Sequence, residues 1–132
     1  MIEDNREAAN GLDGMLSLLG YAVRVALGPR AALEALAQHV PDVIFLDIHM
    51  RGLDGVEVCR YIRRDPRTAR VIIVAISSDS QPALIERVRL AGADGFLAKP
   101  VEQALLEDVT EEVALRLALK ATTDDARQTT VR

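Results

Sequence analysis

The sequence predicts a single α/β domain in which a parallel sheet is covered by helices on both faces. Residues 43–46 and 71–76 form short, continuous apolar runs that are rich in β-branched side chains. This composition is typical of strands that are buried on both faces. Helical patterns stand between the apolar runs, and alternating strands and helices joined by short loops favour right-handed crossovers and a doubly wound sheet.

The other elements follow from weaker signals. Two further strands are predicted at residues 21–26 and 95–98, and five segments carry apolar residues at helical spacing: 7–19, 30–38, 56–64, 82–91 and 102–119. Gly20 and Gly92 follow two of these helices and supply C-terminal stops. Residues 120–132 are polar and poor in apolar side chains, so we expect a domain over residues 1–119 and a disordered tail after it.

Composition excludes several classes of protein. The 132 residues suffice for one core, and no apolar run approaches the roughly 18 residues of a membrane span. The single cysteine, Cys59, excludes an internal disulfide and fits a reducing compartment. A net charge of −4 argues against a protein that binds nucleic acid through a basic surface. We therefore expect a cytoplasmic protein with no membrane partner and no direct nucleic-acid partner.

Polar residues follow each predicted strand, and in doubly wound sheets ligands bind outside the carboxyl ends of the strands. Three acidic residues, one hydroxyl and one of only two lysines are brought to this edge: Glu3, Asp4, Asp47, Ser77 and Lys99. Polar residues are common after strands, but this chemistry from four separate strands is not a usual coincidence. The set is therefore the candidate functional site.

The chemistry of the set is restrictive. Three neighbouring carboxylates repel one another unless a cation lies among them, and hard oxygen ligands favour Mg²⁺ over zinc. Asp47 ends the most buried strand and is the natural nucleophile, since a carboxylate can form an aspartyl-phosphate. Lys99 and Ser77 are placed to hold phosphoryl oxygens by charge and by hydrogen bond.

The motifs resemble the receiver domain of bacterial two-component response regulators. The segments that carry the resemblance are Glu3-Asp4-Asn5, Leu46-Asp47-Ile48-His49-Met50, Leu53-Asp54-Gly55, Ser77 and Lys99-Pro100. Ser77 and Lys99 follow Asp47 by 30 and 52 residues, as the family pattern expects. The resemblance covers residues 2–119 and implies a flavodoxin-like fold with a five-stranded parallel sheet in the order 2-1-3-4-5.

The resemblance also implies a role for each residue of the set. Asp47 is the expected phosphoacceptor, loaded from a phosphohistidine on a sensor histidine kinase or a histidine phosphotransfer protein. Asp4 and Asp47 are expected to bind Mg²⁺, Glu3 to act through a coordinated water, and His49 to contribute its backbone carbonyl.

Conformational signalling is expected to use two further positions. Ser77 matches the switch hydroxyl of the family and Phe96 its switch aromatic, and the Lys99–Pro100 bond is expected to be cis. The implied function is a phosphorylation-dependent switch, not an enzyme with a separate substrate, that signals to a downstream protein partner through its changed face.

The start of the chain departs from the family pattern, because only Met1 and Ile2 precede Glu3. Missing buried strand residues cost about 1.5–3 kcal/mol each. The sequence leaves three explanations open: a truncated or misassigned start, a partner chain that covers the gap by swapping or dimer contacts, or a short strand that holds Glu3 and Asp4 loosely.

Two rival functions follow from the same residues. The first is a phosphorylation-independent interaction module, a degenerate receiver whose metal site is weakened by the short first strand. The second is a phosphatase of the haloacid dehalogenase type, but that family needs a second carboxylate two residues after the first, where this chain has His49.

Overall fold

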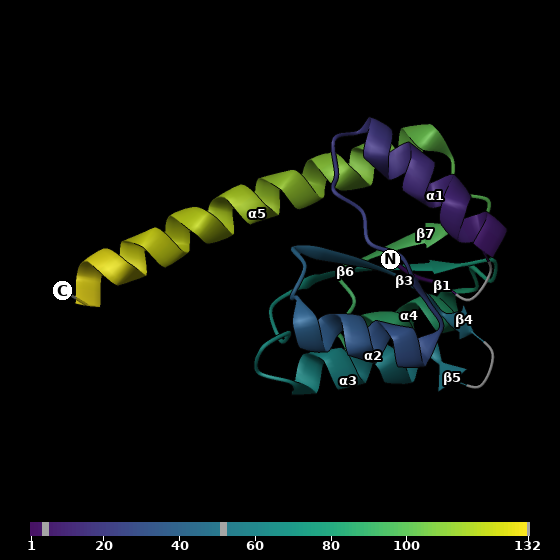
Figure 1. Cartoon of the computed structure of the whole chain (residues 1–132), viewed down its shortest axis with the longest axis horizontal. Coiled ribbons are helices and arrows are strands. Elements are labelled where there is room, and N and C mark those ends of the chain that lie inside the picture. Colours follow the sequence, from purple (N-terminus) through teal and green to yellow (C-terminus); the bar gives the residue numbers. More distant parts are fainter. Residues whose placement is uncertain (4–5, 51–52, 132) are drawn as a thin grey trace.

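The computed structural model describes residues 1–3, 6–50 and 53–131, and it has the predicted doubly wound architecture (Figure 1). Five parallel strands form one sheet in the order β2-β1-β3-β6-β7. The strands are β1 (Ile2–Glu3), β2 (Ala26–Leu27), β3 (Val43–Asp47), β6 (Ile72–Ser77) and β7 (Gly95–Ala98). Counting only these five strands along the chain, the order is the predicted 2-1-3-4-5, which confirms the fold class.

Helices cover both faces of the sheet. They are α1 (Arg6–Leu18), α2 (Pro29–Gln38), α3 (Gly55–Arg64), α4 (Pro82–Ala91) and α5 (Gln103–Val131). Figure 1 shows α1 and the start of α5 on one face, and α2, α3 and α4 on the other. Each helix begins within a residue of its predicted start, and α4 ends at Gly92 in the left-handed conformation that a glycine stop predicts.

The two apolar runs form the centre of the sheet and divide the core into two layers. Ile44 and Leu46 point into the layer beneath α2, α3 and α4, whereas Phe45 points into the layer beneath α1 and α5. All five residues of β3 pair with β6, from Val43↔Ile72 to Asp47↔Ile76. Because these strands are apolar on both faces, they are held in the middle of the molecule, and the polar residues that follow them are held with them.

A small antiparallel pair that the sequence analysis did not predict follows β3. Its strands are β4 (His49–Met50) and β5 (Leu53–Asp54). Strands of two residues carry no alternating pattern, which explains why the sequence signal is absent. Asp54 then caps α3, with its side chain accepting a hydrogen bond from the backbone N–H of Val56 at 2.9 Å, as the Asp-Gly turn predicts.

The C-terminal helix is longer than predicted. The sequence analysis ends it at residue 119 and expects a disordered tail, whereas the backbone of α5 is helical to Val131 and projects away from the sheet (Figure 1). Residues 120–131 contain neither glycine nor proline. A polar composition leaves a segment few apolar side chains for packing, but it does not by itself end a helix. The predicted end of this helix at residue 119 is therefore wrong. The domain boundary at residue 119 stays a prediction.

Candidate functional site

Asp47 lies at the carboxyl end of β3, in the middle of the sheet edge. Its residue is 3% exposed, because β1 and β6 flank its strand on either side. One carboxylate oxygen, Oδ1, accepts a hydrogen bond from the backbone N–H of His49 at 3.1 Å. The other, Oδ2, accepts one from the Lys99 ammonium at 3.3 Å. The predicted nucleophile is therefore a buried carboxylate oriented by one backbone donor and one cation.

Lys99 reaches this carboxylate from the far side of β6. It directly follows β7, and its backbone N–H donates to the carbonyl of Ser77 at 2.8 Å, which continues the β6–β7 ladder by one residue. The Lys99–Pro100 bond is cis, as predicted. The side chain of Lys99 is 27% exposed and that of Asp47 is 4% exposed, so the ion pair lies at the mouth of the site, not on the open surface.

Ser77 ends β6, the strand next to β3. Asp47 is in register with Ile76, so Ser77 lies one residue beyond the aspartate along the neighbouring strand. Its residue is fully buried, and its hydroxyl oxygen accepts a hydrogen bond from the backbone N–H of Asp79 at 3.0 Å. The hydroxyl is thus held by its own loop in this structure.

The acidic pair is described only in part. The backbone of Glu3 ends β1 and pairs with Leu27, which places its strand end beside that of β3. Asp4 lies outside the described residues. His49 has an exposed side chain. Phe96 is partly buried and packs against the core layer that contains Ile44.

The part of the site that the structure describes fits a hard cation such as Mg²⁺ in its donor chemistry. Asp47 supplies carboxylate oxygens, and the carbonyl of His49 lies two residues further along the same chain. Among residues 1–3, 6–50 and 53–131 no group of three or more acidic, histidine or cysteine side chains forms a complete metal site. A complete ligand set would therefore need the acidic residues at the end of β1 and directly after it, Glu3 and Asp4.

Gly55 is a site residue whose role the sequence analysis missed. An Asp-Gly pair is typical of a turn and helix cap, but the backbone N–H of Gly55 also donates to the carbonyl of Ile48 at 2.8 Å. A Cβ atom at this position would lie 2.6 Å from the carbonyl oxygen of Asp47 and would also collide with the backbone of Ile48. Only glycine allows α3 to begin directly against the segment that carries the nucleophile. A sequence without an alignment offers no signal that separates this glycine from an ordinary turn.

The structure thus brings a buried carboxylate at the end of one strand next to a lysine that follows a strand two positions away in the sheet. Comparison with known proteins identifies the family. Residues 1–111 match the family described as response regulator receiver domain. The chain belongs to this family, the receiver domains of two-component systems.

Relatives and solved structures agree with this assignment. The chain is 34% identical over 127 residues to the response regulator MprA of Mycolicibacterium vanbaalenii, covering 95% of this chain and 51% of the relative. It is 33% identical over 107 residues to the response regulator PleD of Caulobacter vibrioides, covering 80% and 23%. The chain thus spans about half or less of these curated relatives.

The fold is similar to that of solved receiver domains. The receiver domain of a DNA-binding response regulator from Colwellia psychrerythraea superposes with a TM-score of 0.80 at 31% identity, over 86% of this chain and 94% of that one. Within the described residues, none of the helices combines the length and the apolar character that crossing a membrane requires.

Proposed function

We propose that this protein is a phosphorylation-dependent signalling switch whose phosphoacceptor is Asp47. The observation that carries the proposal is the buried Asp47 carboxylate, 3.3 Å from the Lys99 ammonium, at the carboxyl edge of a receiver fold. Receiver domains are signalling domains that interact with histidine kinases or phosphotransfer proteins. A phosphohistidine of such a partner is the proposed donor, and a downstream protein is the proposed recipient of the signal.

The transfer is a single displacement at phosphorus. A carboxylate oxygen of Asp47 attacks the phosphorus of the phosphohistidine, a P–O bond forms, and the N–P bond breaks with its electron pair returning to the imidazole. The N–H of His49 holds one carboxylate oxygen in place, which restricts the rotation of the nucleophile. Lys99 supplies positive charge where the phosphoryl oxygens arrive.

Mg²⁺ is the proposed cofactor, since receiver domains generally depend on it. Its proposed ligands are Asp4, Asp47 and the backbone carbonyl of His49, with Glu3 acting through water. Bound there, the cation neutralises charge on the phosphoryl oxygens. The buried position of Asp47 next to the strand end of Glu3 supports this assignment.

The proposed switch is a change of hydrogen-bond partner at Ser77. Its hydroxyl accepts from the N–H of Asp79, and a phosphoryl group on the neighbouring strand offers it an anionic acceptor instead. Moving Ser77 draws the loop before α4 toward the site. Phe96, on the adjacent strand and only partly buried, is free to repack into the space that this movement opens.

The test is intact-mass spectrometry after incubation with acetyl phosphate, with and without Mg²⁺. We expect the parent chain to gain one phosphoryl mass only with Mg²⁺, and the variant Asp47→Asn to gain none. A matched control is Asp54→Asn, which alters the N-terminal cap of α3, leaves the acceptor in place and should be labelled like the parent chain. Equal labelling of the parent chain and Asp47→Asn would rule out Asp47 as the acceptor.

One observation favours the degenerate receiver as a second candidate. β1 has only two residues and pairs with β3 at a single position, Ile2↔Leu46, so the strand that carries the acidic pair is weakly anchored. If this module works without phosphorylation, Mg²⁺ up to millimolar concentration leaves the amide NMR signals of residues 47–49 unchanged. A saturable shift of those signals, absent in Asp47→Asn, supports the switch instead.

A further inference from the structure

A cleft lies at the amino ends of β3 and β6, between the loops that precede these two strands and the middle of α5. It has a volume of about 510 Å³, and its walls are residues 40–42, residues of the segment 66–71, and Leu117 and Lys120 of α5. Because β1 and β6 lie on opposite sides of β3, the cleft is not part of the strand line of β1.

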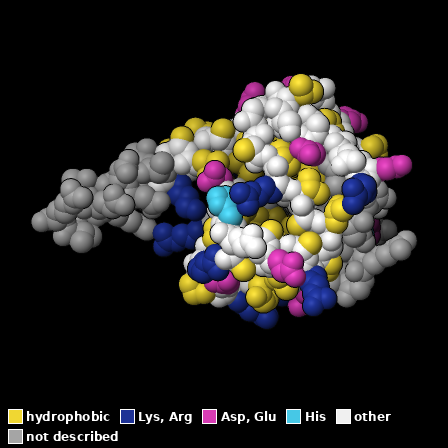
Figure 2. Space-filling view, viewed as in Figure 1, with side chains coloured by type: hydrophobic (Ala, Val, Ile, Leu, Met, Phe, Trp, Pro, Cys, Tyr) yellow, Lys and Arg dark blue, Asp and Glu magenta, His cyan; other side chains and the backbone are white. Residues whose placement is uncertain are grey.

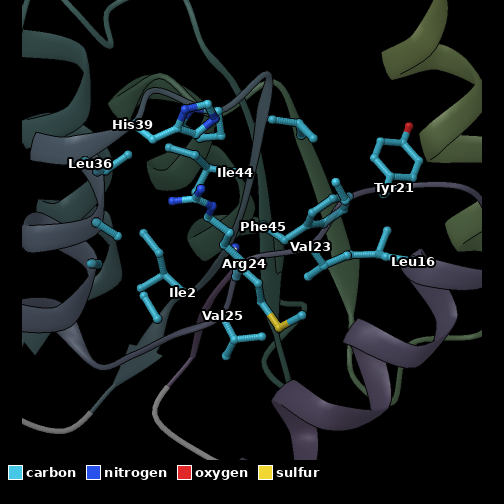
Figure 3. Close-up of a pocket in the computed structure, with 17 residues that line it drawn as sticks. Ile2, Leu16, Tyr21, Val23, Arg24, Val25, Leu36, His39, Ile44 and Phe45 are labelled. Atoms are coloured by element: carbon cyan, nitrogen blue, oxygen red, sulfur yellow. The ribbon is translucent and has the colours of Figure 1, made fainter.

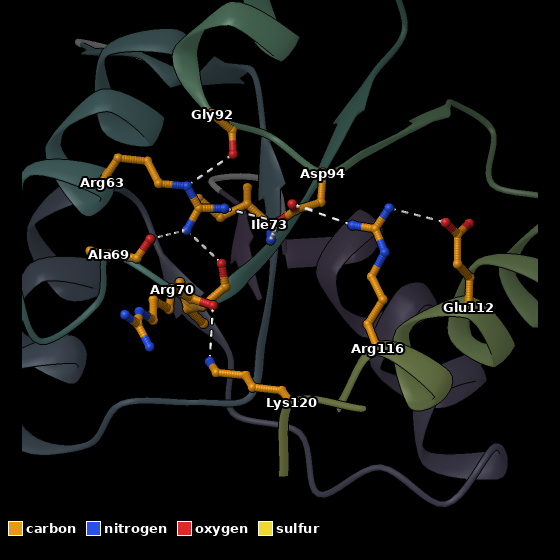
Figure 4. Close-up of polar contacts among 10 residues, drawn as sticks. Arg63, Ala69, Arg70, Ile73, Gly92, Asp94, Glu112, Arg116 and Lys120 are labelled. Carbon is orange, nitrogen blue, oxygen red and sulfur yellow. Dashed lines mark hydrogen bonds and ion pairs between the residues drawn. The ribbon is translucent and has the colours of Figure 1, made fainter. Parts of the chain in front are cut away.

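Three cationic side chains line this cleft: Arg67, Arg70 and Lys120. The Lys120 ammonium donates to the backbone carbonyl of Arg70 at 3.1 Å, and a guanidinium nitrogen of Arg67 donates to the carbonyl of Leu36 at 3.0 Å. Figure 4 shows the first of these contacts, with the Arg70 side chain extending away from Lys120. Both acceptors are uncharged, so these hydrogen bonds hold the cations in place without neutralising their charge.

The positive charge of the cleft is not balanced by the protein itself. Among the described residues, none of the three cations forms an ion pair with a carboxylate, whereas Arg63 and Arg116 both pair with Asp94. The described lining contains one acidic side chain, the exposed Asp42, so three cations and one carboxylate give the cleft a net charge of +2 on a chain whose net charge is −4. Figure 2 shows basic side chains gathered on the side of the molecule from which α5 projects.

The cleft also offers an apolar surface. Pro41, Pro66 and Leu117 line it from three different segments, and each is at least partly exposed. The neighbouring cavity in Figure 3 is different, because it is lined mainly by apolar side chains such as Ile44 and Phe45 and shares only Pro41 with the cleft. A ligand that fills the cleft therefore meets apolar groups and several positive charges together.

A compact polyanion matches this arrangement poorly. The Arg67 and Lys120 side chains are held in two separate places, by carbonyls of α2 and of the loop before β6, and a single phosphate group would have to pull them from these hydrogen bonds. The Asp42 carboxylate also repels a concentrated negative charge. Carboxylates that are spaced along a peptide, with an apolar side chain between them, meet the cations separately.

We propose that this cleft binds an acidic segment of a partner protein, in which an apolar side chain stands between carboxylates. The carboxylates pair with the three cations, and the apolar side chain covers the two prolines and Leu117. The cleft lies at the amino ends of the strands, whereas Asp47 lies at the carboxyl end of β3. This surface is therefore separate from the proposed phosphorylation site.

The test uses a peptide of the sequence Glu-Glu-Leu-Glu-Glu, labelled with a dye at its N-terminus and amidated at its C-terminus. It is titrated with the full chain and followed by fluorescence anisotropy. We expect saturable binding of one peptide per chain, which weakens as the salt concentration rises. Glutamine in place of every glutamate should weaken binding by at least about tenfold, because each surface ion pair contributes up to about fivefold. Serine in place of the leucine should weaken binding about fivefold, because the apolar contact is lost.

Variants with matched controls locate the binding. Arg70→Glu and Lys120→Glu should each weaken binding about tenfold, whereas Arg30→Glu, exposed and outside the lining, should bind the peptide like the parent chain. Asp42→Asn should bind about threefold more tightly, because it removes the repelling carboxylate, and Asp108→Asn, exposed on α5 and outside the lining, should not. Unfolding does not raise affinity, so Asp42→Asn remains informative if another variant fails to fold.

Several results would overturn the proposal. Equal binding of all three peptides would indicate nonspecific association, and equal effects of Arg70→Glu and Arg30→Glu would place the binding elsewhere. Displacement of the peptide by inorganic tripolyphosphate at a lower concentration than by the unlabelled peptide would identify a phosphate site instead. Loss of binding in Asp47→Asn would place the peptide at the proposed phosphorylation site. A dimer of the chain alone that Arg70→Glu converts to monomer, while Arg30→Glu does not, would make a second copy the occupant.

Discussion

At the scale of single residues, Gly55 makes a demand that no other glycine among the described residues near the site makes. Its missing side chain lets α3 start against the carbonyl of Asp47. Gly55→Ala forces the backbone of residues 47 and 48 to shift, and we expect a loss of about 1–3 kcal/mol in the free energy of unfolding. Urea denaturation measures this loss, and phosphorylation by acetyl phosphate should slow in parallel.

The matched control for that prediction is Gly95→Ala in β7. There an added Cβ would lie 3.8 Å from a methyl carbon of Val74, an ordinary contact, and the φ angle is not in the left-handed region. We expect its stability to stay within about 0.5 kcal/mol of the parent. If Gly55→Ala were as stable as Gly95→Ala, the close approach of α3 to the nucleophile would be wrong.

Cys59 is the second residue with a specific consequence. It is fully buried, and its thiol donates to the carbonyl of Ala91 at 3.5 Å. Burial raises the pKa of this thiol above its ordinary value, partly offset by the charge of Arg63. Because the folded-state pKa is raised, the stability contribution of the protonated thiol is present below about pH 8.5 and is lost as the pH rises through the folded-state pKa.

We therefore expect Cys59 of the native protein to react with a disulfide reagent far more slowly than the same thiol in denaturant. The absorbance of released thiolate follows both reactions at neutral pH. The difference between the reaction rates of the native and the denatured protein should become smaller as the pH rises above about 8.5, because the folded state then loses stability. Rapid labelling of the native protein at neutral pH would show that the thiol is accessible after all.

The residues of the site show how far sequence reasoning reaches. Asp47, Ser77 and Lys99 were found because polar residues at the ends of buried strands meet at one edge of a parallel sheet, and the structure places all three there. The close approach at Gly55 was not predictable, since such a contact of two backbone segments leaves no trace in composition. The hydrogen bond that the Ser77 hydroxyl accepts from the N–H of Asp79 depends on loop geometry and was not predictable either.

At the scale of elements, Arg63 at the end of α3 holds several segments together (Figure 4). Its guanidinium donates to the carbonyl of Gly92 at 2.9 Å, to the carbonyls of Ala69 and Val71, and to the Asp94 carboxylate at 2.9 Å. Five arginines lie between residues 60 and 70, a pattern that is typical of a solvated helix face and its following loop. That interpretation is wrong for Arg63, because the sequence pattern does not show that uncapped carbonyls lie within reach of its guanidinium.

The contact continues from Arg63 to α5. Asp94 also accepts from the backbone N–H of Ile73 at 2.9 Å and forms an ion pair with Arg116 at 3.4 Å. One polar cluster thus connects four segments of the chain: the ends of α3 and α4, the start of β6 and the middle of α5. The cluster lies at the opposite end of the sheet strands from Asp47, so its role is structural.

We expect Arg63→Met to lower the free energy of unfolding by about 2–3 kcal/mol, because it keeps the aliphatic packing but leaves carbonyl groups without donors. Thermal or urea denaturation measures the change. Arg64→Met, on the exposed side of the same turn, is the control and should stay within about 0.5 kcal/mol. Equal effects of the two substitutions would contradict the bridging role of Arg63.

At the scale of the whole molecule, the sheet has two unequal halves. β3 and β6 pair along five residues and β6 and β7 along four, whereas β1 pairs with β3 at one position and with β2 at two. The fold class and strand order were predictable because the central strands are apolar on both faces. The start of β2, predicted at residue 21 and found at Ala26, and the end of α5 were not, because no sequence signal fixes either limit.

The weak half is also where the acidic residues of the proposed metal site begin. If the proposed metal site and phosphorylation are correct, any contact that stabilises β1 will strengthen Mg²⁺ binding and raise the rate of phosphorylation.

The central claim, that Asp47 accepts the phosphoryl group, is tested most directly by mapping the modified residue. After treatment with acetyl phosphate and Mg²⁺, borohydride reduces an acyl phosphate to the alcohol, which converts the phosphorylated aspartate to homoserine. Peptide mass spectrometry should then find homoserine at position 47 and unmodified aspartate at 42 and 54. Homoserine at another position, or none in a chain shown to be folded, would contradict the account.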